Sequence, residues 1–353
     1  MAHQATVLIQ STFMNGSKFW RVSQTILRAL EKLERMLSCM PASGLMSETL
    51  PVCLYLTLKR CLLKMTLPKV SILISVFEQL AYTKRCLRAL EDTLPENLEY
   101  EVLIVDDCSK DGTVEFLKGL EEPCLCFFNT EKKGFAKNNN FAASKAKGEF
   151  LCFLNNDVFV DGDWLLPMIE VFREKPDAGV VGNVQKLASS KKFDHMGVVF
   201  GPQGNPRHFG QWFKNSRFQG EVRKWSAVTA ACCLVKKEKF LELNGFDESY
   251  LNGCEDVDLC LRFNRHGTSN YVVHDSIVIH VKGATEGRKR FNLRNSQILM
   301  ERWGEQIKSN ESVTDQRLHA VNYIYRGMIR PFSVNLWKWL EAVAIYLKIK
   351  KLF

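Results

Sequence analysis

No stretch of the sequence offers the roughly 18 uncharged, apolar residues that a membrane-spanning helix requires. Residues 1–25 also lack the continuous apolar core of a signal peptide. The closest candidate for a span, residues 50–58, is interrupted at once by Lys59 and Arg60. These absences argue against a secreted or membrane-spanning protein and predict a cytoplasmic one.

The 12 cysteines lack the spacing of a zinc site, because no paired C-x2-C motifs occur. Cys124 and Cys126 lie too close together in the chain for zinc ligands, as do the adjacent Cys232 and Cys233. Others, such as Cys86, fall within apolar periodic segments, where a free thiol behaves as a small hydrophobic side chain. Free thiols of this kind indicate a reducing compartment.

The motifs of several large enzyme classes are also missing. The sequence has no G-x-G-x-x-G fingerprint, no P-loop and no Ser/His/Asp order of a hydrolase triad. The net charge is +9, yet no nucleic-acid-binding motif accompanies it, so we do not expect a nucleic-acid partner.

The composition is that of a globular protein, with 46% hydrophobic and 25% charged residues among 353. Apolar runs alternate with helical periodicity from residue 68 to residue 160, which predicts a parallel sheet with right-handed crossovers. The expected strands are 70–76, 100–105, 125–128, 150–154, 179–182, 269–274 and 276–281. The expected helices are 82–90, one beginning near 113, 138–147 and 256–265, and residues 186–224 are expected to be irregular. The predicted fold class is α/β, with a mainly parallel central sheet flanked by helices.

Three regions are distinguished by their patterns. Residues 1–67 contain Val22, Ile26, Leu30 and further leucines at helical spacing, and predict an N-terminal helical extension. Residues 68–310 contain the strand–helix alternation and predict the main domain. Residues 311–353 predict a basic and aromatic C-terminal helical segment.

Three polar segments stand out because they are rich in acids or follow buried strands. Asp106 and Asp107 follow one apolar run, and Asn155-Asn156-Asp157 follows another. The third segment, 251–258, carries three carboxylates within four positions. In open α/β sheets, ligands bind beyond the carboxyl ends of the strands, so these segments predict a common site.

The order of these and other motifs resembles the GT-A glycosyltransferases of family 2, and within it the rhamnosyltransferase-like branch. The resemblance covers roughly residues 68–305. It is carried by Val70–Glu78, Ile104–Thr113, Gly134–Asn140, Phe153–Val158, Phe193–Phe200, Trp225–Val235, Asn244–Asp247, Glu255–Arg262 and Ile279–Gly283. It implies a Rossmann-like GT-A fold and transfer of a sugar from a nucleoside diphosphate.

The resemblance also implies a nucleotide-sugar donor site. Asp106 or Asp107 would accept a hydrogen bond from the imide N–H of the base, although Asp107 could instead cap the next turn. Asn156 would bind the ribose, and Lys282 would add positive charge near the diphosphate. The full set of expected donor-binding residues is Ser75, Phe77, Glu78, Asp106, Asp107, Asn139, Asn156 and Lys282.

A divalent cation, Mn²⁺ or Mg²⁺, is the implied cofactor. The triplet Asn155-Asn156-Asp157 stands where the family carries a D-x-D-type motif, and only its last position is acidic. Such ions in phosphate sites use one or two carboxylates together with phosphate oxygens. Asp157 is therefore the expected metal ligand, with His280 as a second; a lone histidine after a strand can also be structural.

Asp256 matches the general base of the family, which would take a proton from the attacking hydroxyl in one in-line, inverting displacement. Glu255 flanks it. Asp258 and Trp225 are expected at the acceptor. The structural alternatives are that Asp256 and Asp258 stabilise the positive, N-terminal end of a helix, and that Trp225 belongs to the core.

The C-terminal segment predicts a partner. Between residues 319 and 353 the basic side chains outnumber the acidic ones, with aromatic residues between them. This pattern favours attachment to an anionic membrane surface, or else a helix packed on the domain or on a second copy in a homo-oligomer. The basic residues are Arg326, Arg330, Lys338, Lys348, Lys350 and Lys351, against the single acid Glu341.

The resemblance implies an inverting glycosyltransferase, and the C-terminal pattern places it at the cytoplasmic face of a membrane. The donor would be a UDP- or dTDP-linked sugar and the acceptor a hydroxyl of a glycan or lipid-linked glycan. The alternative is a non-catalytic, glycosyltransferase-like subunit that binds nucleotide or glycan within a larger assembly. The incomplete Asn-Asn-Asp triplet motivates that alternative.

Overall fold

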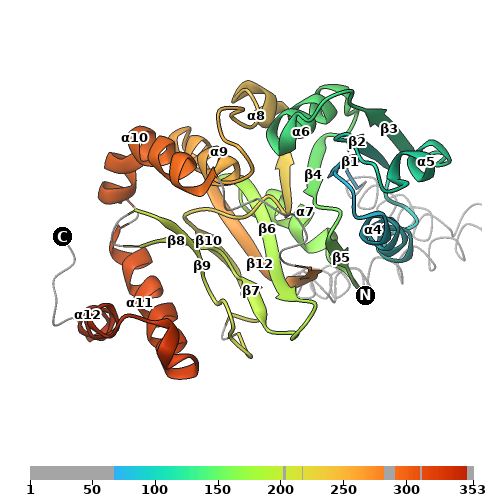
Figure 1. The fold of residues 1–353 in the computed structure, drawn as a ribbon. Coiled ribbons are helices and arrows are strands. Elements are labelled where there is room, and N and C mark those ends of the chain that lie inside the picture. Colours follow the sequence, from blue (N-terminus) through green and yellow to red (C-terminus); the bar gives the residue numbers. More distant parts are fainter. Residues whose placement is uncertain (1–66, 202–203, 217, 282–290, 311, 348–353) are drawn as a thin grey trace, which may run out of the picture. The chain divides into compact units, whose positions relative to one another are not determined.

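The computed structural model describes residues 67–201, 204–216, 218–281, 291–310 and 312–347 (Figure 1). The chain divides into two units, Met1–Pro68 and Lys69–Phe353, and all elements named below belong to the second. The predicted N-terminal extension falls almost entirely outside the described residues, as does Lys282.

The first half of the second unit alternates strands and helices as the sequence predicts. Its strands β1 and β4 have the predicted bounds, because each is a short, mainly apolar run between polar segments. The elements are β1 (Val70–Val76), α4 (Leu80–Thr93), β2 (Tyr100–Asp106), α5 (Thr113–Lys118), β3 (Cys124–Phe128), α6 (Gly134–Lys145) and β4 (Phe150–Leu154).

The second half is more elaborate than the sequence predicts. Its first part, which continues directly from β4, contains β5 (Val158–Val160), α7 (Leu166–Glu174), β6 (Ala178–Leu187), β7 (Phe193–His195), β8 (Val198–Phe200), β9 (Pro206–His208) and β10 (Val222–Trp225). It continues with β11 (Cys232–Lys236), α8 (Lys237–Glu242), α9 (Glu255–Arg265) and β12 (Ser269–His280). The two predicted strands 269–274 and 276–281 are wrong, since β12 is one strand that continues past the exposed Asp275 with a register shift.

The main sheet has the order β10-β12-β6-β11-β4-β1-β2-β3, with β5 beside β12 and β7 beside β6. Strands β1, β2, β3, β4, β6 and β12 all run in the same direction, and β11 runs against its neighbours β4 and β6. Helices flank this sheet (Figure 1). The predicted α/β class with a mainly parallel sheet is confirmed.

Aromatic side chains fill much of the core between the sheet and its helices. Phe153 of β4 packs against Phe240 and Phe246, with ring centroids 5.0 and 4.8 Å apart. All three are at most 1% exposed. Buried aromatic rings of this size contribute strongly to the hydrophobic free energy of folding.

Three helices and a 3-10 turn follow the sheet: α10 (Asn292–Asn310), α11 (Ser312–Ile329), η2 (Pro331–Ser333) and α12 (Leu336–Tyr346). The buried Asp315 carboxylate fastens α11 to the domain. It accepts hydrogen bonds from the Phe200 amide at 2.9 Å and from the Ser226 hydroxyl at 2.6 Å. Helix α12 packs on α11 around Ala320, Ala342 and Ile345. Within the described part of the chain, no helix has the length and apolarity needed to cross a bilayer.

Candidate functional site

The carboxyl ends of β1, β2 and β4 bring three polar segments to one edge of the sheet. Strand β1 pairs in parallel with β2, with Val76 opposite Asp106, and with β4, with Leu73 opposite Phe153. The residues that follow each strand therefore leave the sheet on the same side. These include Phe77 after β1, Asp106 and Asp107 at the end of β2, and the Asn-Asn-Asp triplet after β4.

The adjacent acids Asp106 and Asp107 have different surroundings. Asp107 caps the start of α6, since its carboxylate accepts from the amides of Lys133 at 2.8 Å and Gly134 at 3.0 Å. The alternative interpretation, that Asp107 is a cap, agrees with these contacts. The helix that Asp107 caps is α6, however, and not α5, which follows it directly in the chain. Asp106 is 1% exposed; its Oδ2 accepts from the Ser109 amide, while its Oδ1 has no hydrogen-bond partner. A buried oxygen without a donor is costly, and a ligand N–H could satisfy it.

Beside these acids, side-chain amides connect β1 with α6. Asn138 donates to the Ser75 hydroxyl at 3.0 Å and accepts from Asn129 at 2.7 Å, and Asn129 also donates to Asp107. The predicted residue Asn139 instead donates to the Phe135 carbonyl of its own helix and is 1% exposed. The residue that faces Ser75 is therefore Asn138, which the sequence analysis did not select from three consecutive asparagines.

The amide of Asn156 holds the turn after β1. Its Nδ2 donates to the Thr83 hydroxyl at 3.0 Å and to the Glu78 carbonyl at 3.5 Å. A carboxylate at this position would have no N–H to donate. Glu78 has a left-handed φ of 55°, and its amide donates to Ser109 at 2.6 Å. Asn156 thus has a structural role that depends on its side-chain N–H, which an aspartate lacks.

Phe77, which follows β1 directly, is partly exposed and lies under a cation. The Lys132 ammonium is 3.3 Å from the centroid of its ring. A cation over an aromatic face is favourable by electrostatic attraction. The predicted pocket residue therefore has one face already covered by Lys132.

The pairing of β5 with β12 brings Asp157 and His280 together. His280 lies opposite Val158, and the Val281 amide donates to the Asp157 carbonyl at 2.9 Å. The imidazole Nε2 of His280 is 3.4 Å from Oδ2 of Asp157, and the two residues are 4% and 8% exposed. The two predicted metal ligands are thus neighbours, although they are far apart in the sequence.

This pair fits a divalent cation. Two ligands that bind one ion at right angles, each at about 2.1 Å, lie about 3.0 Å apart, and the observed separation is 3.4 Å. Among the described residues no cluster of three or more His, Cys, Asp and Glu side chains could hold an ion. An ion bound here would take its remaining ligands from phosphate oxygens and water, as is usual in phosphate sites.

Asp256, in the first turn of α9, is linked to the same edge. Its Oδ2 accepts from the Ala230 amide at 3.2 Å, and the next residue, Ala231, accepts from the Asn155 amide at 2.9 Å. Two short contacts therefore connect Asp256 with the triplet that contains Asp157. Asp256 is also half-buried, whereas Glu255 and Asp258 are fully buried.

Asp258 points into the protein and not toward an acceptor. It accepts hydrogen bonds from Trp303 of α10 at 2.7 Å, from Arg262 at 2.8 Å and from Tyr250 at 3.3 Å. Burial, together with the nearby Asp258 charge, raises the pKa of Tyr250. These contacts fasten α9 to α10. The sequence predicts Asp258 at the acceptor, whereas in the structure its carboxylate is bonded within the protein. Glu255 accepts from the Gly253 amide and helps to fold the turn before α9.

Trp225 lies in the core and not at a surface pocket, in agreement with the alternative interpretation of this residue. It is 3% exposed and packs against Phe209, with ring centroids 5.2 Å apart, and against Phe218 and His274 at 6.1 Å. A Cβ at Gly197 would come within 2.1 Å of its ring, so glycine is needed there. With both faces covered, Trp225 cannot contact a sugar in this conformation.

Two asparagines that the sequence analysis missed position the loop before α9. Asn295 of α10 accepts from the Leu251 amide at 3.2 Å and donates to the Leu251 carbonyl at 2.9 Å. Asn252 accepts from the Phe135 amide at 3.5 Å and has a left-handed φ of 49°. It thereby connects this loop with the start of α6, which Asp107 caps. No local pattern indicates Asn295, because its partner lies far away in the sequence.

Residues 71–242 match the model of the family described as Glycosyl transferase family 2. The O-antigen biosynthesis protein RfbC of Myxococcus xanthus is 31% identical over 239 residues, which cover 62% of this chain and 18% of RfbC. Rhamnosyltransferase WbbL of Escherichia coli (strain K12) is 26% identical over 218 residues, which cover 55% of this chain and 77% of WbbL. This chain thus corresponds to less than a fifth of RfbC.

A solved structure supports the fold assignment. The crystal structure of GalNAc-T7 with UDP, GalNAc and Mn²⁺ is similar with a TM-score of 0.56 at 16% identity, over 72% of this chain and 51% of that chain. At this identity the likeness shows the fold alone. The fold is GT-A, and the chain contains a glycosyltransferase family 2 domain over residues 71–242. The predicted family and fold are confirmed.

The contacts of Asp258 lead to a test of its position. Replacing Asp258 by Ala should lower the free energy of unfolding by about 3–5 kcal/mol, because Arg262 would lose its partner in a buried ion pair. The measurement is urea unfolding, with Asp92→Ala on the exposed face of α4 as the control; that change should stay within about 0.5 kcal/mol. If Asp258→Ala were as stable as the wild type but bound acceptor poorly, the acceptor role would replace the structural one.

Proposed function

We propose that the protein is an inverting glycosyltransferase that moves a sugar from a nucleoside diphosphate to a hydroxyl group. The observation that carries this proposal is that hydrogen bonds through Ala230 and Ala231 connect Asp256 with the Asn-Asn-Asp triplet, whose Asp157 lies beside His280. Glycosyl transfer requires that a departing diphosphate be neutralised and that a hydroxyl lose its proton. The pair suits the first task and Asp256 the second.

The nucleoside would bind beyond β1 and β2. The buried, unpartnered Oδ1 of Asp106 supports a contact with the imide N–H that uracil and thymine both carry. A UDP- or dTDP-linked donor would supply this N–H. Ser75 and Asn138 would line the nucleoside pocket beside it, and Phe77 and Glu78 its outer wall. Lys282 is proposed to lie near the diphosphate.

Asp157 and His280 would hold the cation, Mn²⁺ or Mg²⁺. Such an ion, when bound, stabilises the negative charge that develops on the leaving diphosphate. The solved structure of GalNAc-T7 contains UDP and Mn²⁺, which supports a divalent ion in this fold. The chain itself supplies one carboxylate and one imidazole, and their burial shields them from bulk water.

Asp256 would act as the general base. The Ala230 amide donates to one of its oxygens and the Val257 amide to the other, so this half-buried carboxylate is held in place, and a remaining lone pair would take the proton of an acceptor hydroxyl. The hydroxyl oxygen attacks the anomeric carbon as its proton passes to Asp256, and the bond to the diphosphate breaks on the opposite face. A single displacement of this kind inverts the anomeric configuration. Glu255 supports the reaction indirectly, by holding the turn that carries Asp256.

The acceptor would be a glycan or a lipid-linked glycan at the cytoplasmic face of a membrane. The names of RfbC, an O-antigen biosynthesis protein, and WbbL, a rhamnosyltransferase, support a role in building a polysaccharide. A hexosyl or deoxyhexosyl group fits both names. Peripheral attachment would keep the enzyme beside an acceptor of this kind.

The sharpest test is Asp256→Asn, which preserves shape and removes the base. Turnover should fall by about 10²–10⁴-fold, while calorimetry should show unchanged donor binding. Asp92→Asn, on the exposed face of α4, is the control and should be fully active. Unchanged turnover in Asp256→Asn would reject the assignment of the base.

The same assay addresses the non-catalytic alternative. A screen of UDP- and dTDP-sugars should find at least one that the wild type hydrolyses faster than Asp256→Asn does. If no donor were hydrolysed above that background, while nucleotide still bound, the protein would be a binding subunit.

A second prediction concerns the cation. A chelator should abolish both sugar transfer and donor hydrolysis, and added Mn²⁺ or Mg²⁺ should restore them. Asp157→Ala should weaken the binding of intact UDP-sugar more than the binding of uridine, because uridine has no phosphate for the ion to hold. Full activity in chelator would contradict a metal-dependent mechanism.

A further inference from the structure

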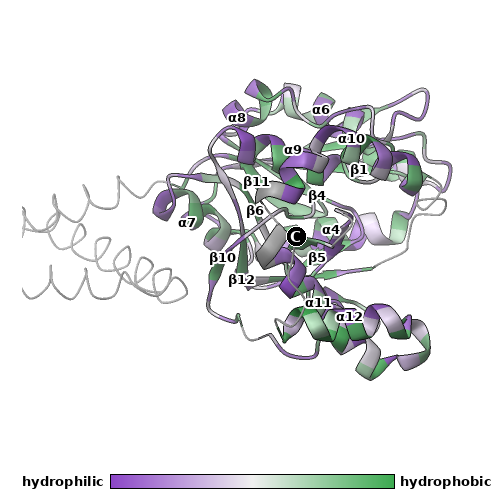
Figure 2. Ribbon diagram, turned by 90° about the vertical axis from the view of Figure 1, so that its left-hand side faces the viewer, coloured by the Kyte–Doolittle hydropathy of each residue, from purple (hydrophilic) through white to green (hydrophobic). Residues whose placement is uncertain are grey.

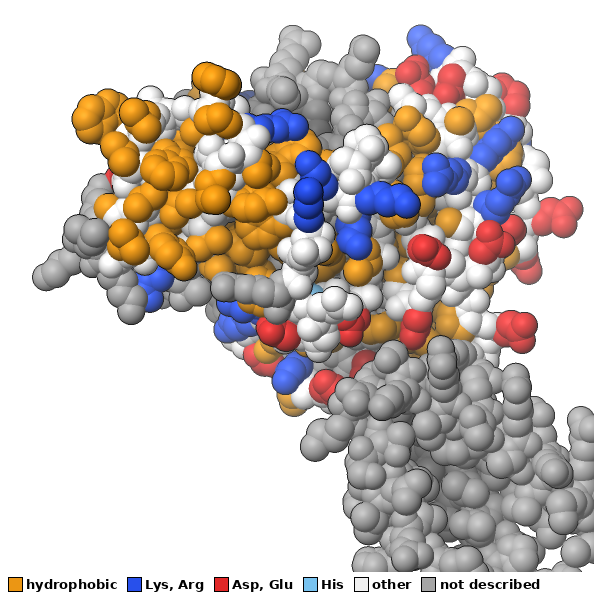
Figure 3. All heavy atoms as spheres, turned by 90° about the horizontal axis from the view of Figure 1, so that it is seen from below, with side chains coloured by type: hydrophobic (Ala, Val, Ile, Leu, Met, Phe, Trp, Pro, Cys, Tyr) orange, Lys and Arg blue, Asp and Glu red, His pale blue; other side chains and the backbone are white. Residues whose placement is uncertain are grey.

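The hairpin formed by α11, η2 and α12 exposes many large apolar side chains. Phe332 is fully exposed, and Trp337 and Met328 are 79% and 72% exposed. Figure 2 shows apolar residues along both helices, and Figure 3 shows them gathered on the face seen from below. We call this surface the apolar patch; it comprises Met328, Ile329, Phe332, Leu336, Trp337, Leu340, Tyr346 and Leu347.

The hairpin is firmly attached to the catalytic domain. Asp315 bonds to Phe200 and Ser226, and the Trp339 indole donates to the Ile324 carbonyl at 3.2 Å. Arg326 donates from Nε and Nη2 to the hydroxyl and carbonyl oxygens of Ser333, each at 3.2 Å, and so fixes the turn that carries Phe332. The patch is therefore a formed surface whose apolar side chains are held outward by packed helices.

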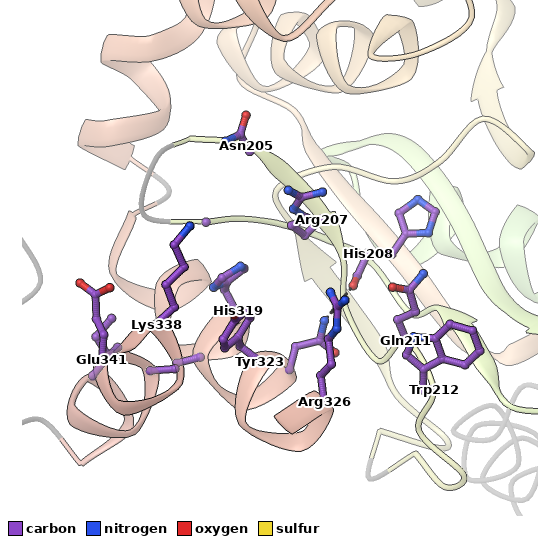
Figure 4. A pocket seen from close by; sticks show the side chains of 15 residues that line it. Asn205, Arg207, His208, Gln211, Trp212, His319, Tyr323, Arg326, Lys338 and Glu341 are labelled. Atoms are coloured by element: carbon purple, nitrogen blue, oxygen red, sulfur yellow. Dashed lines mark hydrogen bonds between the residues drawn. The ribbon is translucent and has the colours of Figure 1, made fainter. Parts of the chain in front are cut away.

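A cavity of about 320 Å³ lies beside this hairpin, between β9, α11 and α12 (Figure 4). Its volume is within the ≈ 300–1,000 Å³ of small-ligand sites. Arg207, Arg326 and Lys338, from three different elements, line it, and Glu341 is its acid. Among the described residues neither Arg207 nor Lys338 has an acidic partner. The cavity is thus suited to an anion.

His319 adds no charge to this cavity at neutral pH. Burial, assisted by the nearby Arg207 charge, lowers the pKa of His319 to about 4. The ring stacks on Tyr323, with centroids 6.2 Å apart. The positive charge of the cavity therefore comes from the two arginines and the lysine.

We infer that the apolar patch and the adjoining cavity dock the protein on an anionic lipid bilayer, with a lipid phosphate held by Arg207, Arg326 and Lys338. Phe332, Leu336 and Trp337 enter the boundary between headgroups and acyl chains, where amphipathic and aromatic side chains are favoured. The sequence continues past α12 with Lys348, Lys350 and Lys351, which add to the charge complementarity with such a surface.

A membrane suits these observations better than a protein partner does. Interfaces between proteins are depleted in lysine, whereas here lysines accompany the apolar side chains along the sequence. The inference rests on the proposed function, because attachment would hold the enzyme at the surface where a lipid-linked acceptor lies. It is nevertheless tested without sugar transfer.

The experiment is co-sedimentation of the full chain with vesicles of phosphatidylcholine, alone or mixed with phosphatidylglycerol. Two triple variants test the two parts of the surface. The apolar variant is Phe332→Ser, Leu336→Ser and Trp337→Ser, matched by Leu125→Ser, Phe128→Ser and Leu241→Ser elsewhere. The charge variant is Arg207→Gln, Arg326→Gln and Lys338→Gln, matched by Lys118→Gln, Lys145→Gln and Lys236→Gln. Because Arg326 also holds the turn at Ser333, the double variant Arg207→Gln and Lys338→Gln is measured beside it and should weaken binding in the same direction.

The wild type should bind the mixed vesicles, more weakly at high salt, because screening reduces attraction to the charged surface. The charge variant should bind roughly 10²-fold more weakly, since each basic residue near such a surface contributes about fivefold. The apolar variant should lose binding to a similar degree, and both matched controls should bind as the wild type does. Brominated lipids should quench the tryptophan fluorescence of the wild type more than that of Trp337→Phe, which keeps the fold intact.

Three outcomes would overturn the inference. The first is that either triple variant binds vesicles as well as its control. The second is that the charge variant loses binding of inorganic phosphate while vesicle binding is unchanged, which would make the cavity a site for a soluble anion. The third is that the apolar variant splits an oligomer while its vesicle binding persists, which would make the patch an interface between copies. Asp256→Asn should bind vesicles normally, and both triple variants should still hydrolyse sugar nucleotide, so failure here is separable from failure of the proposed function.

Discussion

The common direction of the central strands is the constraint on which the rest of the structure depends. Because β1 runs parallel to both β2 and β4, the segments after all three strands emerge at one edge. The short antiparallel pairing of β5 with β12 then places His280 beside Asp157 at that edge. If any of these strands ran the other way, its polar residues would lie at the opposite end of the sheet.

In two pairs of neighbouring acids, one carboxylate makes structural hydrogen bonds and the other is the candidate for ligand binding. Asp107 caps α6 while Asp106 keeps an oxygen without a partner. In the same way, Asp258 is fully engaged by α10 and its own helix, whereas Asp256 stays half-buried. Asp107 thus holds backbone amides and Asp258 holds neighbouring side chains, whereas Asp106 keeps a buried oxygen without a donor and Asp256 stays partly exposed. The arrangement gives the site rigidity without using up its charge.

Much of the sheet could be predicted from the sequence because β1, β2 and β4 are apolar runs with polar ends. Strand β5 was missed because three residues are too few to show a period, and β12 was divided because the exposed Asp275 resembles a break. Asp157, His280 and Asp256 were placed by their motifs. The positions of Asn138, Trp225 and Asp258 were not predictable in the same way, because they depend on which face of an element meets a distant neighbour. Local patterns carry no information about that contact.

The most direct test of the account is a crystal structure of the protein grown with UDP and Mn²⁺, in which anomalous scattering locates the ion. The account predicts one peak between Oδ2 of Asp157 and Nε2 of His280, about 2.1–2.3 Å from each, with the uracil imide beside Oδ1 of Asp106. Bound UDP with the ion held elsewhere, or with no contact to Asp157 and His280, would contradict it.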